Sequence, residues 1–165
     1  MTASDSESLT LQAIPFFIQA GLVSHLEAEE KRKYIRDVIS VVKERVRTLR
    51  ELAEASRYFF QEIEGYDEKG IEKYFIKQEG VCTLLSKGRE CLTALDHFDV
   101  ENVESVYRQL MDELKIKGGI IIHPTRLALT GRTVSPGLFE VMALLGKRKC
   151  IERLDKAIEF IRKKI

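Results

Sequence analysis

Apolar residues recur at helical spacing along most of the chain, and this pattern constrains the fold more than any other feature. Between residues 30 and 46, Tyr34, Val38, Val41, Val42 and Val46 follow the i, i+3, i+4 pattern of one amphipathic helix face. Only residues 119–122 resemble a strand, and that stretch is too short to build a sheet. The sequence therefore predicts an all-α fold. The predicted helices cover residues 9–20, 30–46, 49–60, 67–75, 80–95, 99–114, 124–131, 135–145 and 147–164.

Residues that start or stop helices divide this pattern. Thr48 and Glu51 fit a capping box, in which a hydroxyl and a carboxylate each bind a backbone N–H of the first turn. Pro124 is suited to start a short helix that ends at Gly131, and Ser135 before a proline predicts the next helix start. The other predicted boundaries are N-caps at Asp67 and Asp99 and glycine stops at Gly21 and Gly146.

Two glycines at positions 118 and 119 predict a flexible joint between two helical subdomains, residues 9–116 and residues 117–165. Residues 1–8 are polar and acidic, and we expect them to be a disordered linker or an artificial end of the chain. They lack the basic-then-apolar order of a secretory signal.

Charge is unevenly distributed along the chain. Residues 117–165 hold eleven Lys or Arg and four acids, a net charge of +7, whereas residues 1–116 carry −6. Such an asymmetry is typical of a domain that presents one basic end to a polyanion such as nucleic acid. The alternative is that these cations lie on ordinary solvated helix faces and helix C-termini.

Membrane-spanning and secreted classes are not favoured. The chain has no run of eighteen apolar residues. Its three cysteines are odd in number and widely spaced, which indicates a reducing compartment such as the cytoplasm rather than a disulfide framework. They are Cys82, Cys91 and Cys150.

The sequence also lacks the residue patterns that are typical of catalytic sites. His25, His97 and His123 occur singly, and none has a second His or Cys at metal-ligand spacing. The glycines lack the spacing and the following Lys-Ser or Lys-Thr of a phosphate-binding loop. An independent hydrolase or transferase is therefore the least favoured function.

The most informative segment covers residues 123–140. Its short turns are expected to bring Arg126 and Arg132 close to the hydroxyls of Thr130, Thr133 and Ser135. Guanidinium groups, hydroxyls and helix N-terminal amides can bind phosphate and the edges of unstacked bases. Alternatively, the prolines and glycines of the segment only punctuate two short helices, and the pattern alone leaves both interpretations open.

Longer motifs occur along roughly residues 11–161. They are Glu44-Arg-Val-Arg-Thr-Leu-Arg-Glu51, Ala55-Ser-Arg-Tyr-Phe-Phe60 with Tyr66-Asp67 following, Pro124-Thr-Arg-Leu-Ala-Leu-Thr-Gly131, Ser135-Pro-Gly-Leu-Phe-Glu140, Leu144-Leu-Gly-Lys147 and Ile151-Glu-Arg-Leu-Asp-Lys-Ala157. With these motifs in this order, the chain resembles the C-terminal, anticodon-binding region of bacterial-type glutamyl-tRNA synthetases. Other glutamyl and glutaminyl enzymes of this class use β-barrels here, so the all-α prediction agrees with the bacterial type.

The resemblance implies a tRNA-binding rather than a catalytic role for this chain. The family's catalytic domain carries a His-Ile-Gly-His-type motif and a Lys-Met-Ser-Lys-Ser-type loop for ATP, and neither occurs here. No cofactor is expected in this chain, while ATP and magnesium would serve the parent enzyme. The implied partners are glutamate tRNA and the catalytic domain of the same enzyme, with the protein a monomer in the cytoplasm.

Site residues follow from the same resemblance. Arg126 is expected to bond base edges or phosphates of the anticodon loop, near Ser135, while Pro136 and Leu138 offer an apolar surface to an unstacked base. Either Arg45 or Arg47 is expected to add to anticodon discrimination. Arg132 is a candidate on charge alone. The alternative function is a free-standing helical interaction or regulatory protein that kept the fold but not tRNA binding.

Overall fold

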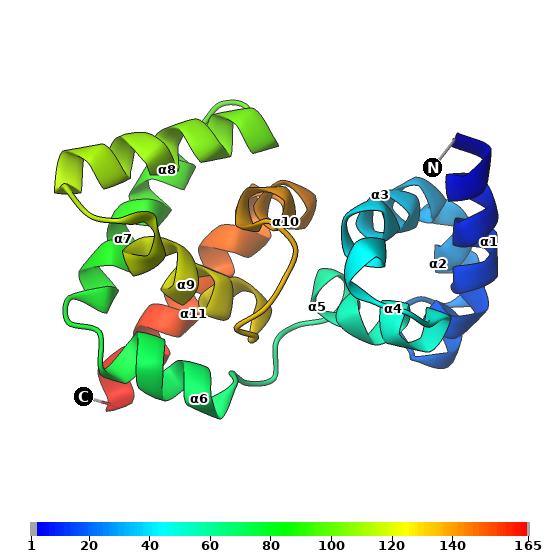
Figure 1. The fold of residues 1–165 in the computed structure, drawn as a ribbon, viewed down its shortest axis with the longest axis horizontal. Coiled ribbons are helices and arrows are strands. Elements are labelled where there is room, and N and C mark those ends of the chain that lie inside the picture. Colours follow the sequence, from blue (N-terminus) through cyan, green and yellow to red (C-terminus); the bar gives the residue numbers. More distant parts are fainter. Residues whose placement is uncertain (1–2, 165) are drawn as a thin grey trace. The chain divides into compact units, whose positions relative to one another are not determined.

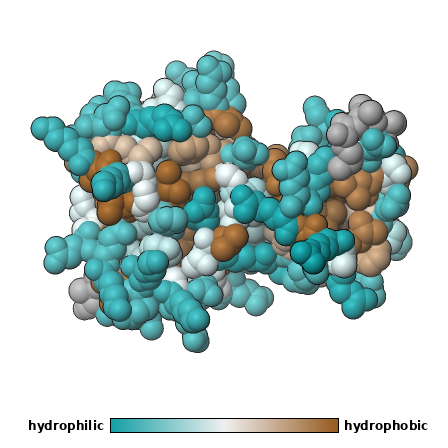
Figure 2. Space-filling model, in the orientation of Figure 1, coloured by the Kyte–Doolittle hydropathy of each residue, from teal (hydrophilic) through white to brown (hydrophobic). Residues whose placement is uncertain are grey.

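A computed structural model describes residues 3–164, and no strand occurs among them, so the predicted all-α fold is confirmed. The chain divides into two units, unit 1 (Met1–Glu62) and unit 2 (Ile63–Ile165). Figure 2 shows hydrophilic side chains over the outer surface of each unit and apolar side chains in the spaces between helices.

Unit 1 is a small helical bundle in which α1 packs against α3 and α4 (Figure 1). Val38 and Val42 of the predicted apolar stripe are buried, together with Ile35 and Ile39, which that stripe omits. Phe17 of α1 lies edge-on against Phe60 at a centroid distance of 5.6 Å. The elements are α1 (Ala3–Gln19), α2 (His25–Glu30), α3 (Arg32–Val42), the 3-10 helix η1 (Lys43–Arg45), α4 (Leu49–Ala55) and α5 (Arg57–Phe60).

The N-terminal segment differs from the expectation. Residues 3–8 belong to α1 rather than to a disordered linker, while Met1 and Thr2 lie outside the described residues. The Glu7 carboxylate accepts hydrogen bonds from Arg32 at 3.0 Å and Arg36 at 2.9 Å, and these ion pairs fasten the start of α1 to α3. Such pairing between distant segments cannot be read from a polar stretch of sequence.

Capping signals decide the other boundaries of unit 1. The Thr48 hydroxyl accepts from the Glu51 N–H at 3.1 Å, as predicted. The Glu51 carboxylate accepts from the Arg47 N–H at 3.0 Å rather than from the N–H of Thr48, so only half of the predicted capping box forms. A complete capping box joins Ser24 and Glu27 at the start of α2. Sequence analysis missed that helix although its signal, a serine three residues before a glutamate, was present.

Unit 2 is built around the long helix α11, which packs against α7, α9 and α10 (Figure 1). Helix α8 covers α10 and α7. The Tyr107 side chain of α8 is fully buried, and its hydroxyl lies where a Cβ on Gly88 of α7 would be. The elements are α6 (Glu68–Gly70), the π-helix η2 (Ile71–Ile76), α7 (Val81–Thr93), α8 (Val100–Leu114), α9 (Gly118–Thr130), α10 (Leu138–Leu145) and α11 (Lys147–Lys164).

The division between units lies at residues 62 and 63, whereas sequence analysis placed a flexible joint at residues 117–119. Gly118 and Gly119 instead form the first turn of α9. The buried residues Ile121, Leu127 and Leu129 of α9 pack among the other helices of unit 2, so residues 117–165 share their core with residues 63–116. The glycine pair is therefore not a joint.

Pro124 lies inside α9, so the prediction that it starts a helix is wrong. Residues 119–122 are helical, in agreement with the all-α prediction. A proline in a helix leaves the carbonyl four residues earlier without its N–H partner. Here that carbonyl belongs to Ile120, and it accepts a hydrogen bond from the Gln78 side chain. A side chain from the turn between η2 and α7 thus makes a mid-helix proline tolerable.

The remaining helix signals have mixed outcomes. The stop at Gly131 is confirmed, with φ of 75°. The predicted start at Ser135 is wrong, because α10 begins at Leu138 after Gly137 and no side chain caps it. The Ser135 hydroxyl is engaged elsewhere, as described below. The N-caps at Asp67 and Asp99 and the glycine stops at Gly21 and Gly146 are confirmed.

Candidate nucleic-acid interface

The predicted site residues divide between the two units. Arg45 and Arg47 are exposed in unit 1, where η1 ends and α4 begins. The other five, Arg126, Arg132, Ser135, Pro136 and Leu138, lie in unit 2, on α9, at the first turn of α10 and in the loop between them. We call residues 131–137 the α9–α10 loop.

Arg126 is half-buried rather than fully exposed to solvent. Its Nε donates to the Ser135 hydroxyl at 2.9 Å, and its Nη1 lies 3.4 Å from Nδ1 of His123. The side chain is thus held between its own helix and the α9–α10 loop. An arginine fixed in this way presents its charge in one orientation, because a planar guanidinium bonded at two points cannot turn freely.

Backbone contacts fix the start of the α9–α10 loop. The Thr130 hydroxyl accepts from the Arg132 N–H at 3.0 Å. The Gly131 carbonyl accepts from the Asp67 N–H at 2.9 Å, which ties the loop to the segment before α6. The loop therefore carries Arg132, which is half-buried, on a backbone held at its N-terminal end.

Three predicted residues of this loop and of α10 are buried. Ser135 is 7% exposed, Pro136 is buried, and Leu138 is 3% exposed in the core of unit 2. Leu138 therefore offers no surface to an unstacked base in this structure. Val134 does, because 70% of it is exposed beside Ser135 in the same loop.

An aromatic and basic cluster lies next to Arg126. The His123 ring stacks on Tyr74 of η2 with centroids 5.1 Å apart and planes inclined by 22°. Lys73 lies 5.4 Å from the centroid of the Tyr74 ring. Burial lowers the pKa of His123, and the positive charges of Arg126 and Lys73 lower it further.

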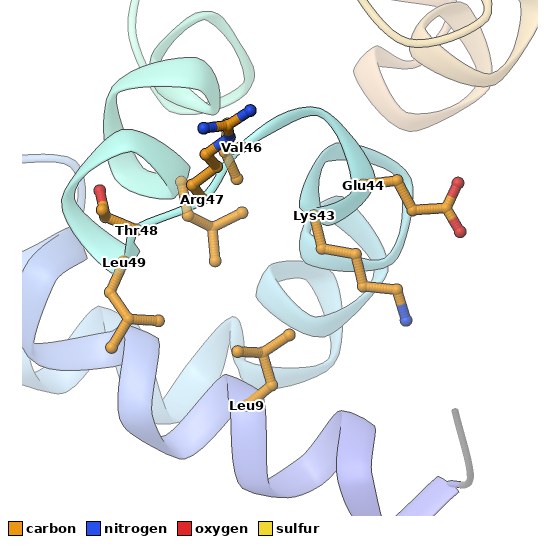
Figure 3. Close-up of a pocket in the computed structure, with 8 residues that line it drawn as sticks. Leu9, Lys43, Glu44, Val46, Arg47, Thr48 and Leu49 are labelled. Carbon is orange, nitrogen blue, oxygen red and sulfur yellow. The ribbon is translucent and has the colours of Figure 1, made fainter.

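Unit 1 contains an open pocket beside Arg47 (Figure 3). Figure 3 shows Leu9 and Leu49 directed into the space between α1 and α4, with Lys43 and Glu44 on its other side. Apolar walls with cationic groups at the rim suit a planar, negatively charged ligand such as a nucleotide. The lining residues are Leu9, Lys43, Glu44, Val46, Arg47, Thr48, Leu49 and Leu52.

Some of the cations counted in the basic segment 117–165 have structural roles. Arg153 is 3% exposed, and its Nη1 donates at 2.8 Å to the Leu129 carbonyl at the end of α9. Lys147 donates at 2.7 Å to the Leu95 carbonyl that follows α7. Both cations bind carbonyls at or just beyond helix C-termini, where positive charge is favourable. The alternative interpretation of the charge asymmetry therefore holds for these two residues.

The described part of the chain contains no candidate metal site and no helix that could span a membrane. No group of three His, Cys, Asp or Glu side chains within residues 3–164 is placed to hold a metal ion. Across the same residues, every helix is too short or too polar to cross a bilayer.

The sequence did not reveal two residues of the candidate interface, Tyr74 and Val134. It also did not reveal the contact between His123 and Arg126. Tyr74 and His123 are 49 positions apart in sequence, so no local pattern relates them. The exposure of Val134 follows from the loop conformation, although a valine among polar turn residues was a weak signal. Arg153 was quoted in a motif, but its burial was not foreseen.

A family model described as an anticodon binding domain matches residues 8–158. Glutamate–tRNA ligase 1 of Caldanaerobacter subterraneus subsp. tengcongensis is 45% identical over 161 residues, which cover 98% of this chain and 33% of that protein. Glutamate–tRNA ligase of Desulforudis audaxviator is 46% identical over 149 residues, covering 89% of this chain and 30% of that protein. The chain thus spans about a third of the length of these relatives.

Solved structures agree on the fold. A crystal structure of a glutamate tRNA ligase from Elizabethkingia meningosepticum superposes with a TM-score of 0.81 over 94% of this chain and 29% of that one, at 24% identity. At such low identity the likeness concerns the fold alone. The match of the family model over nearly the whole chain carries the assignment: the chain belongs to the anticodon binding domain family, in the form that glutamate–tRNA ligases contain.

Proposed function

We propose that this chain binds the anticodon stem and loop of glutamate tRNA, as the tRNA-binding part of a glutamate–tRNA ligase. The observation that carries the proposal is the end of α9 together with the α9–α10 loop, which present an oriented arginine, a second arginine and an exposed apolar side chain on a backbone held at the start of the loop. This set matches what single-stranded RNA loops require, namely hydrogen-bond donors for phosphates and base edges and a surface for an unstacked base.

Within unit 2, Arg126 is the proposed reader of a base edge, because its orientation is fixed by Ser135. Arg132 is the proposed phosphate contact, since a charge at the start of the loop needs no exact direction to attract phosphate. Val134 is proposed to supply the apolar surface first assigned to Leu138. Ser135 and Pro136, both buried, then shape the loop rather than contact RNA through their side chains.

Within unit 1, Arg47 and the pocket beside it are proposed to take a second part of the anticodon region. Arg45 lies two residues earlier, is exposed, and is proposed to strengthen binding through phosphate contacts. The anticodon stem is proposed to bind residues 9–116 and the anticodon loop residues 117–165, ranges that do not coincide with the two structural units.

The wider setting is part of the same proposal. The catalytic domain of the ligase is the proposed partner, and ATP and magnesium would act there rather than in this chain. We propose a monomer in the cytoplasm, and the free thiols of Cys82, Cys91 and Cys150 agree with a reducing compartment.

The test compares Arg126→Ala and Arg132→Ala with a matched control, Arg148→Ala, whose side chain is 84% exposed on α11 of the same unit. Binding is measured to glutamate tRNA, an anticodon variant and an unrelated tRNA at two salt concentrations. Loss of a base contact by Arg126→Ala should cost about 1–3 kcal/mol with glutamate tRNA and less with the anticodon variant. Loss of a phosphate contact by Arg132→Ala should weaken all three tRNAs alike and reduce the salt slope by about 1.

Arg148→Ala should change neither the affinity nor the preference among the tRNAs. If both site variants bind all tRNAs as the unmodified protein does, the assignment of this loop to tRNA is wrong. If the unmodified protein binds no tRNA, a free-standing interaction protein becomes the better description of the chain.

A further inference from the structure

His123 occupies a fixed position between two elements of unit 2. One ring face stacks on Tyr74 of η2, with centroids 5.1 Å apart. The edge that carries Nε2 and Cδ2 faces Gly119, since a Cβ on that glycine would lie 3.5 Å from Nε2 and 3.4 Å from Cδ2. The opposite edge presents Nδ1 to the Arg126 guanidinium, 3.4 Å from Nη1.

The chemistry of the two groups decides the direction of this contact. A guanidinium carries five N–H donors and no acceptor, so Nδ1 of His123 must be the acceptor. The ring is then the neutral tautomer with its proton on Nε2. A second fixed point acts on the same guanidinium, because Arg126 Nε donates to the Ser135 hydroxyl at 2.9 Å.

We propose that His123 is a positioning residue for anticodon reading, which orients the Arg126 guanidinium by accepting its Nη1–H at Nδ1. This inference rests on the proposed function, since it assigns to His123 a role in the same site. Two bonds on different nitrogens hold the plane of the guanidinium more firmly than the bond from Nε does without the bond from Nη1. A held plane presents its donors to one base edge and so favours one base over the others.

The surroundings of the ring keep it in the neutral, accepting form. Burial lowers the pKa of His123, and two positive charges act in the same direction, Arg126 from α9 and Lys73 from η2. Tyr74 of η2 stacks on the ring. Protonation at low pH would place an N–H on Nδ1 opposite the guanidinium, so that two donors and two positive charges would face each other.

The role of His123 predicts an effect on discrimination rather than on general affinity. The readout is the ratio of dissociation constants for two glutamate tRNA transcripts, one with its own anticodon and one with an altered anticodon. His123→Phe keeps a ring that can stack on Tyr74 and removes the acceptor. It should reduce the ratio about threefold to tenfold, as expected for one weak hydrogen bond to a charged group.

His123→Gln is the conservative rescue, because its side-chain oxygen can accept from Arg126 without titrating. It should restore at least part of the ratio. His97→Gln is the matched control, since His97 is an exposed histidine elsewhere in unit 2. Thermal melts of every variant show whether it folds. The pH dependence of the ratio in the unmodified protein supplies an independent readout.

That readout is the pH profile. Between about pH 7.5 and about pH 5, the ratio should fall in the unmodified protein and in His97→Gln as His123 gains its proton, and it should stay flat in His123→Gln. General strengthening of RNA binding by protonation acts on both transcripts and cancels in the ratio.

A normal ratio in folded His123→Phe, or a pH profile unchanged by His123→Gln, would overturn the positioning role and leave the proposed function standing. Equal affinity of the unmodified protein for both transcripts would overturn the two together. A reduced ratio in His123→Phe with recovery in His123→Gln supports the proposal.

Discussion

Replacing Gly131 with alanine tests how the candidate interface is held. Gly131 ends α9 with φ of 75°, a left-handed conformation that L side chains rarely adopt. A Cβ at this position would lie 2.6 Å from the Gly65 carbonyl oxygen and 2.9 Å from Cγ2 of Ile63. The first of these neighbours is backbone, and the Gly131 carbonyl binds the Asp67 N–H of the same segment. The clash therefore cannot be relieved by turning a side chain.

The loss of stability expected for Gly131→Ala has two parts. A non-glycine residue in the left-handed region costs about 1–2 kcal/mol. Overpacking against a neighbour that must move costs typically about 1–3 kcal/mol. Gly131→Ala should therefore lower the free energy of unfolding of unit 2 by about 2–5 kcal/mol.

Gly80→Ala is the matched control. Gly80 belongs to the same unit and has φ of 69°, but a Cβ there would meet nothing within 4 Å. Gly80→Ala should lower the free energy of unfolding only by the cost of the left-handed conformation, about 1–2 kcal/mol. Urea unfolding followed by hydrogen exchange of amides in α9 and α11 reports on unit 2 separately from unit 1. Equal losses of stability in the two variants would refute the argument that the approach of residues 63–65 to Gly131 shapes the loop.

Three further predictions concern single contacts. Arg126→Ala should lower the free energy of unfolding by about 0.5–1.5 kcal/mol, because the hydrogen bond to Ser135 is lost. Arg148→Ala should leave the urea midpoint unchanged. Equal urea midpoints for the two variants would contradict a stabilising hydrogen bond between Arg126 and Ser135. Gly88→Ala should cost about 1–3 kcal/mol, because its Cβ would lie 2.5 Å from the buried Tyr107 hydroxyl, and adding Tyr107→Phe should recover most of the loss. Because the folded-state pKa of His123 is lowered from 6.5, the unfolded chain binds that proton more readily. Stability should therefore decline as pH falls below about 6.5, and His123→Gln should lack this component; parallel pH curves for the two proteins would contradict it.

Local signals predicted most helices of this fold. The N-caps at Thr48, Asp67 and Asp99 and the stop at Gly131 act within one helical turn, so the sequence carries them directly. Apolar spacing likewise predicted the buried positions Val38 and Val42 of α3. These features depend on neighbours three or four residues apart.

The failures share a physical cause, which is a partner far away in the chain. Pro124 continues α9 because Gln78 satisfies the carbonyl that the proline leaves open. Residues 3–8 are helical because Glu7 pairs with two arginines of α3. The glycine pair at positions 118 and 119 looks flexible alone but begins a helix buried on several sides.

The same distinction applies to the candidate interface. Arg126 and Arg132 were found because arginine beside turn residues is a local pattern. The orientation of Arg126 depends on Ser135 and His123, and the stacking of His123 depends on Tyr74, which lies in another element. Burial of Leu138 and exposure of Val134 follow from the path of the α9–α10 loop, which α6, α9 and α10 set together.

The central claim is that this chain reads the anticodon of glutamate tRNA, and one equilibrium measurement tests it directly. The unmodified protein is titrated with two transcripts of glutamate tRNA that differ only in the anticodon, at one fixed salt concentration. A base contact is worth about 1–3 kcal/mol of discrimination, so the account predicts that the altered transcript binds at least about fivefold more weakly. Equal dissociation constants for the two transcripts would contradict the account.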